Sequence, residues 1–506
     1  MNEIPEPGQS AGPPWAAHLA RGTGADVDLV EDRSLPGRWI HRWRERPAWP
    51  QLRTLEDGWI SSEELEERTR LAARGLRAAG LQPGNRFVIS GATSTQLVIA
   101  YIGALRAGLV VVPMNTAYTR TEVERIVGDA KPAGAAVEDD QRAGWIREAA
   151  GAGMSLVCGV DLAGLQRPAS SDDAELDGTG SDDGALLIYT SGTTGEPKGA
   201  LLSHGNLLSS ATAVNLAWRW EPDDRLLLTL PLFHVHGLGV GLNGSLCAGA
   251  AVVLRPKFDV DDVAERAAES SLFFGVPAMY GRIASSGKAS ALRSLRLLVS
   301  GSAPLPAALS EEVAGAAGQV PLERYGMTET VMLTSNPYDG ERKAGTVGFE
   351  LPGVELRLAD DDEVQVRGPN VISGYYERPD ANAQSFTDDG WFRTGDLGEL
   401  DDDGYLTLVG RSKELIITGG YNVHPREVEE ALATHPGVSE VAVVGRASEE
   451  WGEEVTAVVV ADGPVEVEEL REHAAQQLVS YKVPKRIEFA DELPRNAMGK
   501  IVRSEL

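Results

Sequence analysis

Hydrophobic and polar positions alternate in blocks along this chain, and the blocks predict helices and strands in turn. Residues 62–79 place acidic residues first and then apolar positions at helical spacing, which predicts an amphipathic helix. Residues 86–90 and 110–113 are short apolar runs typical of buried strands, and residues 96–107 between them predict a helix. Such alternation favours parallel sheets covered by helices.

The same alternation continues through the middle of the chain and changes near residue 354. We expect further strands at residues 185–190, 224–230, 251–254, 272–275, 295–300 and 322–325. After residue 354 come short strands and turns, which indicate a small β-rich piece, at residues 354–358, 363–367 and 404–409. The tail after residue 410 has the size of a small α+β domain, with helices expected at residues 427–435 and 467–478 and strands at 438–444 and 455–460.

These patterns predict an α/β fold with two main domains. A segment of residues 1–20, rich in Pro, Gly and Ala, is expected to be poorly ordered. A large N-terminal domain of residues 21–410 should hold parallel sheets flanked by helices, together with the small β-rich subdomain. A small C-terminal domain of residues 411–506 should follow a hinge near residues 411–414. Polar residues 166–183 predict a connecting loop.

Composition and charge narrow the class of protein. The 506 residues are 42% hydrophobic and 24% charged, which is typical of a globular protein with a large core. The formal net charge of −28 argues against nucleic acid as a partner, because phosphate backbones need a basic face. The two cysteines, Cys158 and Cys247, cannot build a disulfide framework. Because no signal peptide and no membrane-spanning segment is apparent, we expect a cytoplasmic protein without membrane insertion.

A glycine- and hydroxyl-rich loop follows the strand expected at residues 185–190. Its backbone N–H groups and hydroxyls can wrap phosphate oxygens, and Lys198 adds a positive charge. It is not a Walker A loop, because no Gly-Lys-Ser/Thr occurs at the required spacing. We expect phosphate contacts from Thr190, Ser191, Gly192, Thr193, Thr194, Gly195 and Lys198.

Several other segments carry groups suited to nucleotide chemistry. Residues 324–330 (Arg-Tyr-Gly-Met-Thr-Glu-Thr) combine an aromatic face, a hydroxyl and a carboxylate directly after an expected strand. Residues 301–304 follow another strand end, where ligands bind in open parallel sheets. Residues 393–396 place Asp396 in an expected turn, and residues 494–500 end in Gly-Lys500.

Together these segments resemble the adenylate-forming superfamily of acyl-CoA synthetases, luciferases and peptide-synthetase adenylation domains. The resemblance covers about residues 50–501, with the motifs in family order. It implies that ATP and a carboxylic acid form an acyl-adenylate, that CoA then forms a thioester, and that Mg²⁺ accompanies ATP. By this resemblance Tyr325 stacks on adenine, Thr328 contacts the α-phosphate, and Glu329, with Thr190, holds Mg²⁺. The other implied nucleotide contacts are Gly301, Ser302, Ala303, Arg324, Gly326, Met327, Asp396 and Arg411.

The resemblance also implies two steps served by different groups. Lys500 would neutralise charge during adenylation. The C-terminal domain would then rotate about Lys413, so that Gly419, Gly420 and Tyr421 line the pantetheine tunnel. His234 would gate the acid pocket. As His234 and His236 are expected to share one face of a strand, a metal pair is the competing interpretation of these two residues.

Two residues suggest which carboxylic acid is the substrate. One is Arg282, on a helix that Pro277 can start, and the other is Ser302. Malonyl-CoA synthetases within the superfamily resemble the chain at both places, and there the matching residues hold the distal carboxylate. We therefore expect a malonate or methylmalonate–CoA ligase. The alternatives are a ligase for medium-chain or aryl acids, luciferase-like oxygenation, and a non-catalytic nucleotide-binding protein. The oligomeric state is left open.

Overall fold

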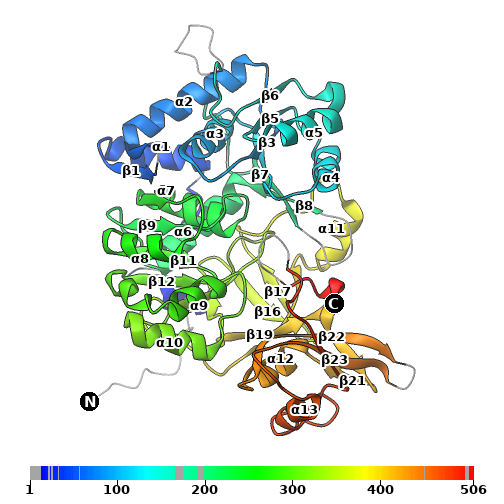
Figure 1. The fold of residues 1–506 in the computed structure, drawn as a ribbon. Helices are drawn as coiled ribbons and strands as arrows, with labels where there is room; N and C mark the ends of the chain where they lie inside the picture. The colour runs from blue at the N-terminus through cyan, green and yellow to red at the C-terminus, as the bar shows by residue number, and fades with distance from the viewer. Residues whose placement is uncertain are drawn as a thin grey trace. The chain divides into compact units, whose positions relative to one another are not determined.

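The computed structural model describes residues 13–20, 23, 27–31, 33–55, 57–165, 175–190, 198–448, 451–495 and 501–506. Contacts divide the chain into two compact units (Figure 1): residues 1–355 with 366–390, and residues 356–365 with 391–506. The strand–helix alternation is confirmed as an α/β fold. The expected domain boundary at residues 410 and 411 falls inside the second unit and stays a prediction. Among the described residues, no helix has the length and apolar character needed to cross a bilayer.

The first unit contains a six-stranded sheet in the order β6-β5-β3-β4-β7-β8. Neighbouring strands are parallel except for β8, which is antiparallel to β7. The strands are β3 (Arg86–Ser90), β4 (Val110–Pro113), β5 (Gly134–Val137), β6 (Leu156–Cys158), β7 (Gly184–Thr190) and β8 (Lys198–Ser203). The helices of this part of the chain are α2 (Ser62–Ala78), α3 (Thr95–Arg106), α4 (Arg120–Ala130) and α5 (Asp140–Ala150).

A nine-stranded sheet in the same unit has the order β15-β14-β13-β12-β11-β9-β10-β1-β2. Its central strands are parallel. The strands are β1 (Pro50–Thr54), β2 (Gly58–Ser61), β9 (Arg225–Leu228), β10 (Ala251–Leu254), β11 (Leu272–Gly275), β12 (Leu297–Ser300), β13 (Leu322–Tyr325), β14 (Thr334–Ser335) and β15 (Phe349–Glu350). The remaining helices of the unit are α1 (Leu35–Glu45), α6 (His204–Ala217), α7 (Asn243–Ala248), α8 (Val260–Arg266), α9 (Pro277–Ser285), α10 (Ala307–Ala317) and α11 (Pro379–Ser385).

Several helices of this unit begin at side chains that cap them, among them α3 and α4. The Ser94 hydroxyl accepts from the Leu97 N–H at the start of α3, and Thr119 and Glu122 form a reciprocal capping box on α4. Helix α3 lies close to α2 because Gly103 has no side chain: a Cβ there would lie 2.7 Å from the Cβ of Ala72. Every residue of α3 except Gln96 is buried, which agrees with its largely apolar sequence.

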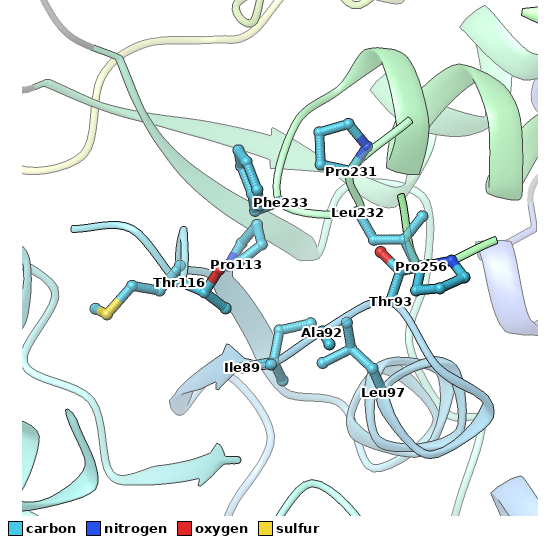
Figure 2. A pocket seen from close by; sticks show the side chains of 12 residues that line it. Ile89, Ala92, Thr93, Leu97, Pro113, Thr116, Pro231, Leu232, Phe233 and Pro256 are labelled. Carbon is cyan, nitrogen blue, oxygen red and sulfur yellow. The ribbon is translucent and has the colours of Figure 1, made fainter. Parts of the chain in front are cut away.

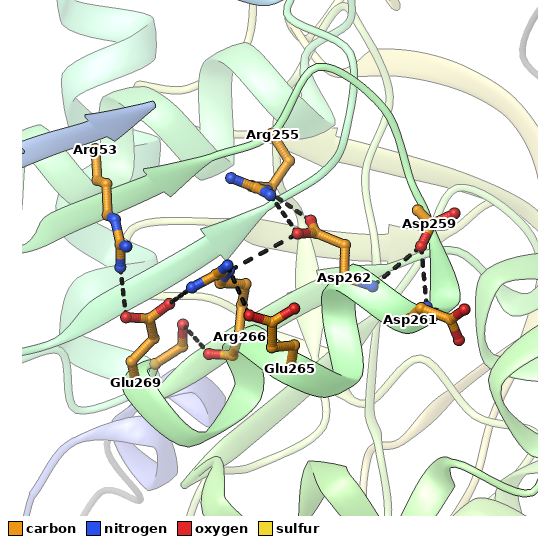
Figure 3. Close-up of polar contacts among 9 residues, drawn as sticks. Arg53, Arg255, Asp259, Asp261, Asp262, Glu265, Arg266 and Glu269 are labelled. Atoms are coloured by element: carbon orange, nitrogen blue, oxygen red, sulfur yellow. Dashed lines mark hydrogen bonds and ion pairs between the residues drawn. The ribbon is translucent and has the colours of Figure 1, made fainter. Parts of the chain in front are cut away.

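An ion-pair network joins β1 and β10 to α8 (Figure 3). Asp262 accepts two hydrogen bonds from Arg255, one of them at 2.5 Å, and the Arg255 side chain is 7% exposed. Glu269 is paired with both Arg53 and Arg266. Because its carboxylates already have guanidinium partners, this cluster is structural rather than a candidate metal or acid site.

The second unit has two sheets. A four-stranded sheet in the order β16-β17-β18-β19 consists of β16 (Glu355–Leu358), β17 (Glu363–Arg367), β18 (Phe392–Leu400) and β19 (Leu406–Arg411). The other sheet consists of β20 (Ile416–Thr418), β21 (Tyr421–Val423), β22 (Val438–Ser448), β23 (Gly452–Ala461) and β24 (Arg486–Phe489). Helices α12 (Pro425–Ala433) and α13 (Val467–Ala475) contribute Val428, Leu432 and Leu470 to its core.

Most expected strands lie within a few residues of the observed ones, and several, including 86–90, 251–254 and 322–325, match in full. One feature differs. Within the segment expected to be poorly ordered, Pro14–His18 form a short 3-10 helix that buries His18. Residues 166–174 of the expected connecting loop at residues 166–183 lie outside the described residues, so that prediction stays a prediction.

Candidate functional site

Two neighbouring parallel strands, β12 and β13, bring the Gly301 and Arg324 segments together. Strand β12 pairs with β13 through Val299 with Leu322 and Ser300 with Glu323. Gly301 and Ser302 follow β12 directly, and Tyr325 ends β13. This is the sheet edge at which open parallel sheets bind ligands. The structure therefore places these two predicted segments at one edge.

The turn after Tyr325 is tightly folded. A Cβ on Gly326 would lie 2.2 Å from the carbonyl oxygen of Val331, so only glycine fits there. Val331 has φ +56°, which is unusual for a β-branched residue. Thr328 and Glu329 are buried in this turn, 9% and 5% exposed, and Ala303, Gly326 and Met327 lie in the same two segments. Such strain is found where surrounding structure holds functional groups in place.

Glu329 has a partner that sequence analysis did not identify. The Tyr375 hydroxyl donates a hydrogen bond of 2.8 Å to Oε1 of Glu329. Burial, and then the adjacent carboxylate, raise the pKa of the Tyr375 phenol. The Nζ of Lys198 lies 5.2 Å from the centre of the Tyr375 ring. Tyr375 thus contacts both the end of the phosphate loop and the predicted Mg²⁺-binding carboxylate.

Arg324 is a buried cation. The residue is 5% exposed, and its Nε and Nη2 atoms have no hydrogen-bond partner in the described part of the chain. Burial lowers the pKa of its guanidinium to about 9, and Glu323 opposes that shift. A Cβ on Gly301 would lie 2.4 Å from Cζ of Arg324, so the guanidinium lies directly against this glycine.

Ser302, which directly follows Gly301 in the chain, forms a polar pair with His236. Oγ of Ser302 lies 3.1 Å from Nδ1 of His236, and Ser302 has the left-handed φ of +70°. The His236 ring stacks on Phe274 with 6.3 Å between centroids. The expectation that His234 and His236 share a strand face is wrong. His234 lies in a turn and His236 begins a π-helix (His236–Leu242), because three glycines there relax the backbone.

Arg282 lies on the expected helix, α9, which begins at Pro277. Its side chain is exposed, and Cζ lies 5.0 Å from the centre of the Phe258 ring. The nearby guanidinium also contributes to lowering the pKa of Asp259, after the backbone N–H groups that this carboxylate accepts. The contacts described for Arg282 do not include Ser302.

In the second unit, Asp396 and Arg411 form a cross-strand pair. They are register partners on β18 and β19, and Nε of Arg411 lies 2.9 Å from Oδ1 of Asp396. Asp396 lies within a strand and not in the expected turn. The left-handed Gly395, whose N–H donates to Glu363, makes the segment irregular enough to resemble a turn in sequence.

The hinge and CoA candidates lie further along the same unit. Lys413 is exposed in a short 3-10 helix, Ser412–Glu414. Gly419 and Gly420 form the turn of the β20–β21 hairpin, with φ of +57° and +82°. A Cβ on Gly419 would lie 2.9 Å from the Trp451 ring, and Tyr421 stacks on Tyr481 with 4.5 Å between centroids.

Part of the predicted site lies outside the described residues. This applies to Lys500 and to five loop residues: Ser191, Gly192, Thr193, Thr194 and Gly195. Both ends of the loop are described, and Thr190 and Lys198 are register partners on β7 and β8.

A pocket of about 90 Å³ opens beside the turn that contains His234 (Figure 2). It lies where β3 and β4 end, and Leu232 and Phe233 close one side. The labelled side chains are mostly apolar and include Ile89, Leu97, Pro113 and Pro256. An apolar lining of this kind does not suit a carboxylate.

The described residues give no support to the metal interpretation of the two histidines. In the ranges that the structure describes, no group of three or more His, Cys, Asp or Glu residues could hold a metal ion. A single carboxylate such as Glu329 does suit Mg²⁺ that arrives with a nucleotide, because Mg²⁺ keeps several waters and uses phosphate oxygens as ligands. Glu329 therefore fits Mg²⁺ that is bound together with ATP.

Comparison with known proteins covers both units. Residues 38–376 match the AMP-binding enzyme family, and residues 427–500 match the AMP-binding enzyme C-terminal domain. The malonate–CoA ligase of Arabidopsis thaliana is 35% identical over 84% of this chain and 78% of its own length. Feruloyl-CoA synthase of an Amycolatopsis species is 36% identical over 88% of this chain and 93% of its own length.

A solved structure agrees with these sequence relatives. The crystal structure of ATP-bound MatB from Rhodopseudomonas palustris has a TM-score of 0.89 and 39% identity, covering 94% of this chain and 98% of MatB. The matched motifs, the shared fold and the sequence identity all point to one assignment: the chain belongs to the AMP-binding enzyme family.

Proposed function

We propose that this acid–CoA ligase of the AMP-binding enzyme family activates malonate or methylmalonate. In the first step a carboxylate oxygen of the acid attacks the α-phosphorus of ATP and pyrophosphate leaves. In the second step the CoA thiol loses its proton and its sulfur attacks the acyl carbonyl. The C–O bond between the acyl group and the phosphate then breaks, and AMP leaves with the bridging oxygen. The named relatives include malonate–CoA ligases and also feruloyl-CoA and indoleacetate–CoA enzymes, so the acid must be argued from the site.

The observation that carries the dicarboxylate proposal is the buried guanidinium of Arg324. A buried charge whose N–H groups lack hydrogen-bond partners is costly for the folded protein, and a carboxylate that enters beside it lowers the cost. A monocarboxylic acid uses its only carboxylate in the reaction, whereas malonate has a second one. The fork of a guanidinium binds such a carboxylate well.

Ser302 and His236 support the same proposal. The Ser302 hydroxyl follows Gly301, against which the Arg324 guanidinium lies, and it pairs with the His236 imidazole. Both groups can hydrogen-bond to a distal carboxylate. We assign Arg324, Ser302 and His236 to binding of the acid. For Arg324 this role is additional to the nucleotide contact that the sequence resemblance implies. Arg282 stays a proposed acid contact, supported by its helix position and not by a described contact.

For adenylation, the buried turn of Thr328 and Glu329 supports α-phosphate and Mg²⁺ binding, with Tyr325 on the adenine. Mg²⁺ would neutralise phosphate charge, and Glu329 would supply its protein carboxylate. Thr190 and Lys198, at the ends of the loop, would bind the departing pyrophosphate. The Asp396–Arg411 pair suits the ribose hydroxyls, because a carboxylate accepts from both. Lys500 would stabilise the charge that develops at the reacting oxygens.

For thioester formation, His234 would gate the acid pocket and Lys413 would be the pivot of the C-terminal domain. The Gly419–Tyr421 turn would line the pantetheine tunnel. The Gly419–Gly420 turn leaves backbone without side chains, which permits close approach by the pantetheine arm. Lys413 lies in the short helix between β19 and β20, a suitable place for a pivot.

A substrate panel tests the proposal directly. AMP release should be measured with malonate, methylmalonate, acetate, octanoate and coumarate, for the wild type and for Arg324→Met. We expect kcat/KM for malonate to fall by about 100-fold in Arg324→Met, the size typical of a lost charged contact, with acetate little affected. Arg293→Met, which changes an exposed arginine, is the matched control.

Two results would contradict the dicarboxylate proposal. One is wild-type preference for octanoate or coumarate, which would support the medium-chain or aryl alternative. The other is an equal loss for malonate and acetate in Arg324→Met. Absence of AMP release with every acid would point to a non-catalytic nucleotide-binding protein.

A further inference from the structure

Tyr375 joins two parts of the first unit that are distant in sequence. Its hydroxyl donates to Oε1 of Glu329 at 2.8 Å, and Lys198 Nζ lies 5.2 Å from its ring centre. The tyrosine is 9% exposed and Glu329 is 5% exposed, so the hydrogen bond is shielded from water. A shielded hydrogen bond to a carboxylate is stronger than an exposed one.

The backbone of the same segment is fixed on the side of strand β8. Tyr375 forms an antiparallel bridge with Ala200, and the Tyr376 N–H donates to the Gly199 carbonyl at 2.8 Å. Because Gly199 follows Lys198 directly, the tyrosine ring and the lysine are held by one local pairing. The ring position is therefore set by β8 and not by a freely moving loop.

The segment is also fixed to the strained turn that carries Glu329. The Ile372 N–H donates to the Glu329 carbonyl at 2.9 Å. The Asn370 side-chain amide donates to the carbonyls of Thr330 and Met332 at 2.9 and 2.8 Å. These bonds oppose relaxation of the left-handed Val331. The backbone bonds hold the turn, and the Tyr375 hydroxyl adds control over the direction of the Glu329 side chain.

We propose that Tyr375 is a positioning residue for adenylation: its hydroxyl orients the Glu329 carboxylate, and its ring holds the Lys198 ammonium. With ATP and Mg²⁺ bound, the carboxylate would be a ligand of the cation and the ammonium would neutralise phosphate charge. The inference rests on the proposed function for the role of Glu329 and Lys198. Tyr375 itself does not contact the reacting atoms and acts through these two residues.

Tyr375→Phe tests the hydroxyl alone, because the phenylalanine ring still fills the same space. Tyr376→Phe is the matched control: it removes the neighbouring hydroxyl, and the Tyr376 ring packs near Arg86, with 5.7 Å between Cζ and the ring centre. The first readout is calorimetric binding of an ATP analogue with a methylene bridge between the α- and β-phosphates, with Mg²⁺ and with EDTA. It requires no turnover.

We expect Tyr375→Phe to weaken binding of the Mg²⁺ complex by about tenfold, the usual effect of losing a hydrogen bond to a charged group. Binding of the analogue in EDTA should change by less than about twofold. In a Glu329→Gln background, Tyr375→Phe should have little further effect, because the two residues act as a pair. Tyr376→Phe should bind like the wild type.

The second readout separates the two half-reactions. Pyrophosphate release with malonate should slow by about tenfold in Tyr375→Phe, whereas thioester formation from supplied malonyl-adenylate and CoA should not change. A merely structural role would lower both rates and the unfolding temperature together.

The inference is overturned if Tyr375→Phe binds the Mg²⁺ complex like the wild type, or if it loses Mg²⁺-dependent and Mg²⁺-independent binding equally. If Tyr375→Phe does not fold, Lys198→Met and Glu329→Gln replace it. A double-mutant cycle between them in analogue binding should then show coupling, and additive effects would contradict the inference. Failure of the proposed function would give a different result: the wild type would release no pyrophosphate with any of the acids. The binding of the ATP analogue to Tyr375→Phe would still test the role of Tyr375 in that case.

Discussion

A residue that fits its surroundings poorly often indicates what the surroundings are for. Arg324 is such a residue, because its guanidinium is buried, and its Nε and Nη2 atoms lack hydrogen-bond partners in the described ranges. Burial lowers the pKa of the group to about 9, so it stays charged at neutral pH. A side chain kept at such a cost is best explained by a ligand that compensates the charge.

Arg324→Met should therefore stabilise the ligand-free protein. Methionine fills a similar volume without a charge, and we expect the free energy of unfolding to rise by about 1–4 kcal/mol, the range for replacing buried charges by apolar groups. The stabilisation that malonate gives together with AMP should disappear in the variant. Thermal unfolding with and without these ligands measures both effects.

A lower unfolding temperature for ligand-free Arg324→Met would mean that the guanidinium has stabilising partners in the folded protein. Protection of the variant by malonate equal to that of the wild type would mean that the acid binds elsewhere. Arg293→Met, on the surface, controls for loss of charge alone.

At the scale of elements, the sequence predicted the parallel strands well and the irregular elements poorly. Strands such as β10 and β11 are apolar runs bounded by polar residues, and that signal is local. Strands β14 and β15 have two residues each, which is too short for any periodicity. The π-helix at residues 236–242 has no sequence signal distinct from that of a strand end rich in glycine and apolar residues.

The candidate site shows the same division. The segments at the ends of β12 and β13 could be predicted because strand ends and motif residues are adjacent in sequence. The Tyr375–Glu329 hydrogen bond joins residues far apart in the chain, and no local pattern reports it. The only local signal is the Gly374-Tyr375-Tyr376 sequence, which by itself does not indicate a partner for Glu329.

The ion-pair network of α8 gives a prediction at this scale (Figure 3). Arg255→Met should destabilise the protein by about 3–5 kcal/mol, because it leaves Asp262 without its bidentate partner in a partly buried position. The double variant Arg255→Met/Asp262→Asn should recover part of this loss. Urea unfolding of the two single variants and the double variant gives the coupling free energy.

The matched surface control for this cycle is the pair of Arg120 and Glu124, which are half exposed and lie four residues apart on α4. Its coupling should be at most about 0.5 kcal/mol. Equal coupling for the two pairs would contradict the view that the α8 network has a structural role beyond that of a surface pair.

At the scale of the whole molecule, the residues proposed for the nucleotide are distributed over both compact units. Tyr325, Thr328 and Glu329 belong to the first unit, whereas Asp396 and Arg411 belong to the second. Groups on separate units can serve different half-reactions. Each unit still requires a stable core of its own, and the core of the first unit includes titratable groups.

His18 and His204 are buried in the first unit, 1% and 0% exposed, and burial lowers the pKa of each imidazole to about 4. An unfolded histidine has a pKa of about 6.5. Between pH 6.5 and 4 the unfolded chain therefore binds more protons than the folded one, and the free energy of unfolding falls as the pH is lowered. Each histidine contributes a slope of up to about 1.4 kcal/mol per pH unit.

We expect His18→Gln and His204→Gln each to reduce this slope relative to the wild type, even where they lower stability at pH 7.5. Urea unfolding followed by tryptophan fluorescence at several pH values from 4 to 7.5 measures the slope. Comparing each variant with the wild type cancels the contribution of carboxylates that titrate in the same range. His41→Gln, at a side chain that is 50% exposed, should leave the slope unchanged. Equal slopes in all four proteins would show that neither buried imidazole gains a proton on unfolding, so acid sensitivity would then have to come from the carboxylates.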